Sequence, residues 1–307
     1  MKARVSTEWL SGCAGCHVAV VDLHEKLLNL VEDVEFVRAP VLMDEKGYPE
    51  ADVGLVEGAV RSHHDREALL RMRDSVKTLV AFGSCAVYGG PSGLGWLHER
   101  EAVLDRAYRR GPTNAGGQLP DADAVPLEDS VVPIDEIVPV DFYLPGCPPH
   151  PYYIAAGLRT LLGASAPPLT AATVCSDCTR KMRKRPGQLL QKGAVTADDP
   201  ESCFLSQGVV CLGSVTLNRC LAPCPQKGAI CTGCAGPSMD VLAEPHLDMR
   251  GLVAKRMNLL CGIDPKDVKA YFERDAKTFY AYAVASPVIY RKPTVEMLEW
   301  TAAGQSA

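Results

Sequence analysis

Cysteine content constrains this chain of 307 residues more than any other feature of its sequence. Thirteen cysteines are present, and several form pairs with two residues between them, as in CAGC (13–16), CSDC (175–178) and CTGC (231–234). Stable structural disulfides are rare in a reducing compartment, where so many cysteines indicate metal ligation. The fold is therefore expected to gather distant cysteines around metal.

The sequence indicates a cytoplasmic protein that neither inserts into a membrane nor binds nucleic acid. No run approaches the roughly 18 apolar residues of a membrane helix, and the first residues carry neither a signal-peptide pattern nor a twin arginine. The formal net charge of -5 gives no support for a nucleic-acid-binding surface. The basic run at 180–185 is typical of a solvated helix or loop, and no nucleotide-binding glycine motif lies between a strand and a helix.

Residues 1–168 are expected to form an α/β domain. Apolar runs alternate with segments of helical periodicity, which implies a parallel sheet with helices on both faces. The segment 92–138, rich in Gly, Pro and Asp, is expected to be an irregular excursion over the surface. Strands are predicted at 4–10, 34–40, 51–60, 77–84 and 138–146, and helices at 18–33, 65–76 and 151–163.

Four cysteines of this domain directly follow predicted strands. Cys13 and Cys16 follow the first strand, Cys85 follows KTLVAFGS, and Cys147 follows VPVDFYLPG; Glu57 ends another strand in the same way. The carboxyl ends of parallel strands border one crevice, where ligands bind in open α/β sheets. These four cysteines are therefore expected to meet in space. Gly and Pro around them set tight turns and leave backbone N–H groups free to point at sulfur.

From about residue 169 to 307 the pattern changes to a cysteine-rich domain with little regular structure, apart from a helix expected after Arg180. Hydrophobic content alone would hardly organise this region, whereas metal ligation is coupled to folding and would do so. Its eight clustered cysteines fall in two successive stretches, Cys175, Cys178, Cys203 and Cys211 in the first and Cys220, Cys224, Cys231 and Cys234 in the second.

Three kinds of cysteine chemistry compete for these residues. A C-x-x-C between a strand and a helix is also a redox disulfide arrangement, and four-cysteine zinc sites use C-x-x-C pairs as well. Iron–sulfur clusters are favoured because twelve cysteines divide into three quartets and because Cys147 and Cys224 are each followed by proline, as in bacterial ferredoxin motifs. The chain also lacks an evident acid, base or nucleophile constellation.

The remaining candidate ligands suggest no further site. Cys261 is expected to be a buried thiol that acts as a small hydrophobic residue. The histidines show no spacing typical of a metal site and are expected at the surface or at interfaces, with His17 near the first cysteine cluster; they are His17, His24, His63, His64, His98, His150 and His246.

With these residues in place, the chain resembles the small, electron-transfer subunit of cytoplasmic [NiFe] hydrogenases of the F420-non-reducing, methyl-viologen-reducing group. The resemblance runs from WLSGCAGCH through EGAV, GSCAVYGG and PGCPP to CLAPCPQKGAICTGCAGP, nearly the whole chain. It implies a flavodoxin-like N-terminal domain with a proximal cluster and a cysteine-rich C-terminal domain with a medial and a distal cluster.

Carried over residue by residue, the resemblance implies three [4Fe–4S] clusters. The implied ligands are Cys13, Cys16, Cys85 and Cys147 for the proximal cluster, Cys175, Cys178, Cys203 and Cys211 for the distal cluster, and Cys220, Cys224, Cys231 and Cys234 for the medial cluster.

Two positions depart from many periplasmic and membrane-linked members of the family. Those proteins have histidine where this chain has Cys175, and often proline, with a [3Fe–4S] medial cluster, where it has Cys224. Thiolate in place of imidazole lowers a reduction potential, the reverse of the effect of histidine in Rieske centres. A flavin, ferredoxin-like or heterodisulfide-reductase-type acceptor subunit is therefore expected rather than a quinone.

The resemblance implies that the chain conducts electrons and that hydrogen is split at a Ni–Fe centre in a separate large subunit. No catalytic residue is expected here, and Glu57 is expected to have a structural role at the subunit interface rather than to transfer protons. Two alternatives stay open. One is an iron–sulfur subunit of another redox complex, such as the related subunit of complex I, and the other is a zinc-stabilised interaction protein.

Overall fold

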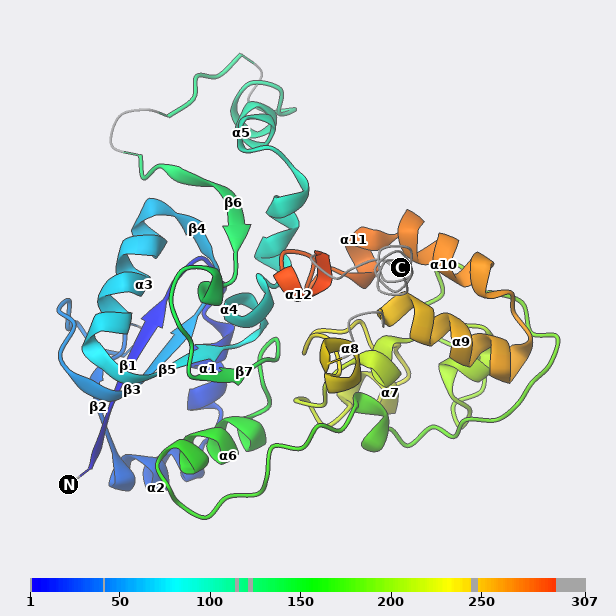
Figure 1. Cartoon of the computed structure of the whole chain (residues 1–307), viewed down its shortest axis with the longest axis horizontal. Helices are drawn as coiled ribbons and strands as arrows, with labels where there is room; N and C mark the ends of the chain where they lie inside the picture. Colours follow the sequence, from blue (N-terminus) through cyan, green and yellow to red (C-terminus); the bar gives the residue numbers. More distant parts are fainter. Residues whose placement is uncertain (1, 41, 114–115, 121–123, 244–247, 291–307) are drawn as a thin grey trace, which may run out of the picture. The chain divides into compact units, whose positions relative to one another are not determined.

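The structure is a computed structural model, and it describes residues 2–40, 42–113, 116–120, 124–243 and 248–290 (Figure 1). The chain divides into two compact units. The first comprises Met1–Leu169 with Tyr282–Ser286, and the second comprises Thr170–Ala281 with Pro287–Ala307. No helix of the described residues is long and apolar enough to cross a membrane.

A five-stranded parallel sheet forms the centre of the first unit. Its strand order, β2-β1-β3-β5-β7, is the flavodoxin-like order in which the chain starts near the middle of the sheet and reverses direction once. The prediction of a parallel α/β domain is thereby confirmed. The strands are β1 (Ala3–Trp9), β2 (Val34–Arg38), β3 (Ala51–Glu57), β5 (Val76–Phe82) and β7 (Phe142–Leu144).

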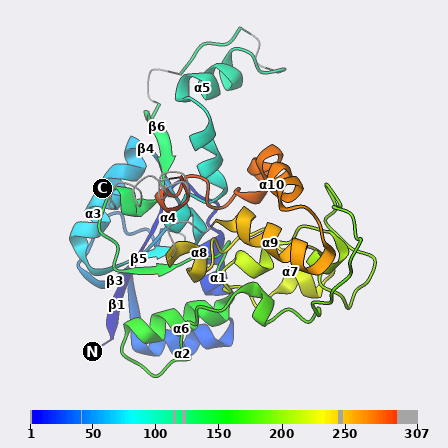
Figure 2. The same cartoon turned by 45° about the vertical axis from the view of Figure 1, so that its right-hand side comes forward.

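Helices cover both faces of this sheet. On one face α2 (Glu25–Asp33) and α6 (Pro151–Leu161) lie side by side near α1 (Gly15–Val21), while α3 (His63–Ser75) and α4 (Ser84–Tyr88) lie on the other (Figures 1 and 2). The start of α3 is fixed by a capping box, in which the Oγ atom of Ser62 accepts a hydrogen bond from the N–H of Asp65.

The single helix predicted over residues 18–33 is wrong, because two helices occupy this region. α1 ends at Val21 and α2 begins at Glu25. Between them His24 has a φ of 51° and a ψ of -127°, while Leu23 is buried. The apolar spacing continues across this break, so periodicity alone could not locate it.

The excursion at 92–138 is more regular than expected. It contains a 3-10 helix (Pro91–Leu97), α5 (Arg100–Tyr108), β6 (Leu127–Val132) and a 3-10 turn (Ile134–Glu136). β6 pairs antiparallel with β4 (Val60–Ser62). The Nε atom of Arg66 donates to Glu128 at 2.7 Å and so ties β6 to α3. This long-range pairing has no local sequence signal.

The second unit joins irregular cysteine-bearing loops to a small helical core, in which Phe272 and Phe279 stack with ring centroids 4.3 Å apart. Its helices are the 3-10 segments Val174–Ser176, Phe204–Gln207 and Leu212–Val215, followed by α7 (Pro223–Gln226), α8 (Met239–Ala243), α9 (Met249–Cys261), α10 (Pro265–Arg274), α11 (Ala276–Phe279) and α12 (Pro287–Tyr290).

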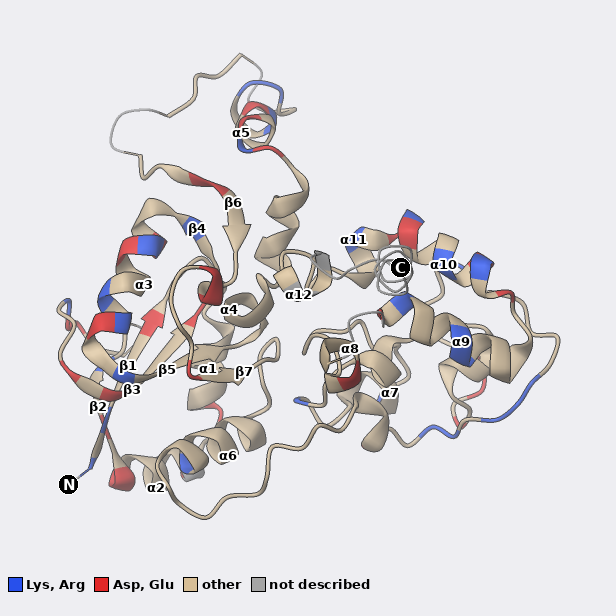
Figure 3. Cartoon of the chain, viewed as in Figure 1, with Lys and Arg blue, Asp and Glu red and all other residues tan. Residues whose placement is uncertain are grey.

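The helix predicted after Arg180 is wrong. This segment, which forms the basic run coloured in Figure 3, is extended and pairs with a neighbouring loop. The N–H of Lys181 donates to the carbonyl of Glu201 at 2.8 Å, and the N–H of Cys203 donates to the carbonyl of Lys181 at 2.9 Å. These bonds to another segment replace the internal bonds of a helix.

A short segment near the end of the described chain returns to the first unit. Tyr282–Ser286 belongs to that unit, and Ala285 is fully buried. A side chain on Gly89 or Gly93 would place its Cβ 2.8 or 2.9 Å from the Cβ of Ala285. The turn after α4 is therefore glycine-rich because Ala285 packs directly on it.

Candidate metal centres

The first candidate centre lies at the carboxyl edge of the parallel sheet. Cys13 and Cys16 follow β1, Cys85 lies in α4 directly after β5, and Cys147 follows β7. Together with Glu57 at the end of β3, these four cysteines line one cavity of about 80 Å³. The structure thus brings together the four cysteines that the strand ends were expected to gather.

Glycines make room for the sulfur atoms of this centre. Gly83 has a φ of +86°, and a Cβ at this position would overlap the Sγ atom of Cys16. Gly90 has a φ of +54°, and its Cβ would lie 2.5 Å from the Sγ atom of Cys85. Only glycine combines these backbone angles with this close approach.

Electrostatics in this centre favour a cationic ligand. Burial raises the pKa of the Cys16 thiol, and Glu57 adds to the effect. Burial, followed by repulsion from Cys147 and Cys13, raises the pKa of Cys85 to about 12. Burial and Cys13 also raise the pKa of Cys147. Thiolates are therefore stable together here only beside compensating positive charge, which the iron ions of a cluster supply.

A buried polar network extends from this centre into the sheet. The backbone N–H of His17 donates to Oε2 of Glu57 at 2.8 Å, and the ring Nδ1 atom of His17 lies 3.1 Å from the same oxygen. Nε2 of His17 shares a 2.8 Å hydrogen bond with Oγ1 of Thr7. Sequence reasoning missed Thr7; its signal was a polar residue two positions after the buried Val5, on the same face of β1.

The second candidate centre lies in the other unit and contains the first C-terminal stretch of cysteines. Burial raises the pKa of Cys175 to about 11, with further repulsion from Cys203 and Cys178. Burial also raises the pKa of Cys211 to about 12, against hydrogen bonds from the N–H groups of Gly213 and Cys231, and Cys203 and Cys175 repel it. The sulfur atoms of Cys175 and Cys211 both approach Gly213, where an added Cβ would lie 3.6 and 3.7 Å from them.

The second C-terminal stretch has charge interactions within itself and with the first stretch. Burial, with a smaller repulsion from Cys224, raises the pKa of Cys220. Burial raises the pKa of Cys231, with repulsion first from Cys211 of the first stretch and then from Cys234. The N–H of Cys231 also donates to the Sγ atom of Cys211 at 3.2 Å, so the two stretches touch directly. Whether the four cysteines of the second stretch share one cluster stays a prediction. Within the described residues, no group of three or more His, Cys, Asp and Glu side chains has the arrangement of a single metal ion site.

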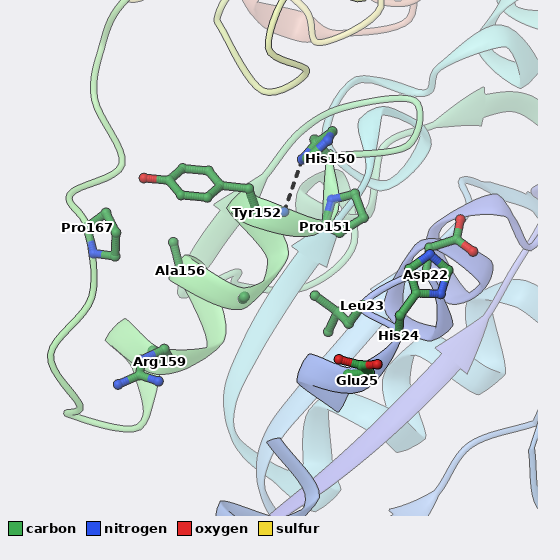
Figure 4. A pocket seen from close by; sticks show the side chains of 11 residues that line it. Asp22, Leu23, His24, Glu25, His150, Pro151, Tyr152, Ala156, Arg159 and Pro167 are labelled. Atoms are coloured by element: carbon green, nitrogen blue, oxygen red, sulfur yellow. Dashed lines mark hydrogen bonds between the residues drawn. The ribbon is translucent and has the colours of Figure 1, made fainter. Parts of the chain in front are cut away.

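A wider cavity lies elsewhere in the first unit. It measures about 750 Å³ and opens between the start of α2 and α6 (Figure 4). None of its lining residues is a cysteine. His150 caps α6 there, since its Nδ1 atom accepts a hydrogen bond from the N–H of Tyr152 at 3.1 Å. This cavity therefore adds nothing to the thiol chemistry of the chain.

Two further expectations concern single residues. Cys261 is buried, as expected, and its thiol donates to the carbonyl of Leu205 at 3.2 Å. His17 is buried rather than exposed, because it fills the space between Glu57 and Thr7. His246 lies outside the described residues.

Comparison with known proteins identifies the family to which the chain belongs. The family described as NADH ubiquinone oxidoreductase, 20 Kd subunit, matches residues 13–161. A subunit of the F420-non-reducing hydrogenase of Methanocaldococcus jannaschii is 39% identical over 77% of this chain and 82% of its own length. The chain belongs to this family of F420-non-reducing hydrogenase subunits. The corresponding hydrogenase subunit of Methanothermobacter marburgensis is 34% identical over 95% of this chain and 97% of its own length.

A solved structure shares only part of this hydrogenase subunit. The crystal structure of an NAD⁺-reducing [NiFe]-hydrogenase in the H2-reduced state has a chain that is 38% identical, with a TM-score of 0.52, over 54% of the present protein and 95% of that chain. By contrast, the likeness to the Methanothermobacter protein extends through both units. The second unit is therefore shared with relatives in the F420-non-reducing hydrogenase family.

Proposed function

We propose that this protein is the small, electron-transfer subunit of a [NiFe] hydrogenase. It relays electrons, in either direction, between the Ni–Fe site of a separate large subunit and an acceptor subunit. The observation that carries the proposal is the meeting of Cys13, Cys16, Cys85 and Cys147 in one cavity at the sheet edge. The names of the relatives, all hydrogenase subunits, support it.

Three [4Fe–4S] clusters form the proposed electron path. When bound, each cluster takes up and releases one electron, and the chain supplies thiolate ligands, burial and N–H groups directed at sulfur. The first unit would hold the proximal cluster and the second unit the other two. The proposed ligands are Cys13, Cys16, Cys85 and Cys147 (proximal), Cys175, Cys178, Cys203 and Cys211 (distal), and Cys220, Cys224, Cys231 and Cys234 (medial).

The large subunit is proposed to cover the edge of the sheet at the proximal centre. Cys13 is exposed there, and the nearby Trp9 and Val18 are 45% and 51% exposed, so apolar side chains lie at the surface beside this centre. The acceptor, of the flavin, ferredoxin-like or heterodisulfide-reductase type, is proposed to receive electrons from the segment between Cys175 and Cys211. The cysteine content favours a cytoplasmic location.

Anaerobic native purification through this chain tests the proposal. A nickel-containing large subunit should copurify, with about 12 iron atoms per small subunit and an equal amount of acid-labile sulfide. Zinc at about two or three atoms per chain in place of iron would support the interaction-protein alternative and exclude the electron path.

The main rival is an iron–sulfur subunit of a complex I-like assembly. The match of residues 13–161 to the NADH ubiquinone oxidoreductase family favours this rival for the first unit alone. The cysteines of the second unit would have no role in such a protein. Recovery of an iron-containing complex without nickel, and with about four iron atoms per chain, would favour the rival.

A further inference from the structure

The guanidinium of Arg180 turns into the second unit and contacts two separate loops, whereas that of Arg185, in the same basic run, binds Asp199 and Ser202 of one of these loops. Its Nη1 atom donates to the carbonyls of Asp199 and Ser202 at 2.9 and 3.0 Å. Its Nε atom donates to the carbonyl of Pro225 at 3.2 Å. The guanidinium carbon lies 4.1 Å from the ring centroid of Phe204, a cation–π contact.

These contacts join three segments that each carry proposed cluster ligands. Arg180 itself follows Cys178 by two residues, Ser202 and Phe204 flank Cys203, and Pro225 follows Cys224. Cys178 and Cys203 belong to the proposed distal site, whereas Cys224 belongs to the proposed medial site. One side chain therefore ties the loops of two different clusters.

The loops that Arg180 joins have little regular structure to hold them. Their carbonyl groups need donors, and a guanidinium offers several N–H groups in a rigid planar fork, whereas a lysine ammonium is a single point donor on a flexible stem. A second tie runs beside it, because Nε2 of Gln226 donates to the carbonyls of Asp177 and Leu221 at 3.0 Å each. The two proposed sites therefore share a hydrogen-bonded frame.

We propose that Arg180 clamps the ligand loops of the distal and medial clusters into one arrangement, so that these two clusters are acquired and lost as a pair. This inference rests on the proposed function, since it concerns the same clusters. Arg180 is a positioning residue in this proposal: it touches the loops, and the cysteines bind the iron.

The test compares three variants in the complete, anaerobically purified complex. Arg180→Gln removes the charge and most donors, and Arg180→Lys keeps the charge but not the fork. Arg183→Gln is the matched control, because Arg183 lies in the same run, its side chain is 50% exposed, and its guanidinium lies 3.7 Å from the 78% exposed carboxylate of Glu201. Iron and labile sulfide are counted, and the low-temperature EPR spectrum of the reduced complex distinguishes the clusters.

Both Arg180 variants should contain about eight fewer iron atoms per small subunit than the wild-type complex, with the proximal EPR signal kept and both other signals lost. The Arg183→Gln complex should contain as much iron as the wild type. The proposal is overturned if Arg180→Gln keeps every cluster or loses only one, or if Arg180→Lys keeps them all, since charge alone would then suffice. Loss of all three signals would also overturn it, by making Arg180 a residue of general stability. A wild-type complex without iron would instead refute the proposed function.

Discussion

Gly83→Ala offers a direct test of how the sheet edge prepares the proximal site. Gly83 precedes α4 with a φ of 86° and a ψ of 161°, a region that is populated almost only by glycine. Alanine there costs about 1–3 kcal/mol in backbone strain alone. Its Cβ would also overlap the Sγ atom of Cys16, so either the sulfur or the turn must move.

We expect Gly83→Ala to lose the proximal cluster and to leave the other two in place. The complex should contain about four fewer iron atoms per small subunit than the wild type, with an equal fall in labile sulfide. The proximal EPR signal should disappear, and electron transfer from hydrogen to an added acceptor should stop, because the first carrier is missing. Metal analysis and EPR of the purified complex measure these changes.

Gly157→Ala is the matched control within the same unit. Gly157 lies in α6, and an added Cβ would meet Leu144 at an ordinary contact distance of 3.4 Å. Alanine in a helix interior is favoured over glycine by up to about 1 kcal/mol, so this variant should keep all its iron and be at least as stable as the wild type. Full retention of iron and of the proximal signal in Gly83→Ala would refute the assignment of Cys16 to a crowded cluster site.

Three further predictions concern stability. Ser62→Ala removes the cap of α3 and should cost about 1 kcal/mol in urea unfolding. Phe272→Ala empties a fully buried position in the second unit and should cost about 3–5 kcal/mol, seen as earlier loss of the C-terminal clusters on heating. The pKa of Asp141 is lowered by the N–H of Leu79 and by Arg73, so Asp141 stabilises the fold above its ordinary pKa of 3.8 and loses this effect as pH falls through its lower folded value. Asp141→Asn should therefore be less stable than wild type at pH 7 and equal to it in strong acid; an unchanged difference in acid would contradict this.

The sheet of the first unit could be predicted because its signals are local. Apolar runs such as KTLVAFGS mark buried strands, and the position of Cys85 after one of them fixes where its sulfur lies once the strands are parallel. Glu57 could be placed at the same edge for the same reason. The break at His24 could not be predicted, because it depends on how Leu23 reaches the core.

For the second unit, the sequence predicted the candidate cysteine ligands but not the backbone structure that carries them. The spacing of Cys175 and Cys178 indicates metal binding, but nothing local predicts that the segment after Arg180 pairs with the loop around Cys203. Its order arises from long-range donors to carbonyl groups, such as the guanidinium of Arg180. The basic residues themselves do not indicate which side chains turn inward. The extended conformation of this run was missed because it depends on backbone hydrogen bonds to the loop around Cys203.

The packing of Ala285 on Gly89 and Gly93 has a consequence for biosynthesis. Residues 282–286 complete the first unit, yet they are synthesised only after residues 170–281 of the second unit. Because synthesis proceeds from the N-terminus, a nascent chain exposes the turn after α4 until residues 282–286 emerge. That turn begins at the carbonyl of Cys85, to which the N–H of Gly89 donates. The turn beside Cys85 therefore takes its final packing only after residues 170–281 of the second unit have been synthesised.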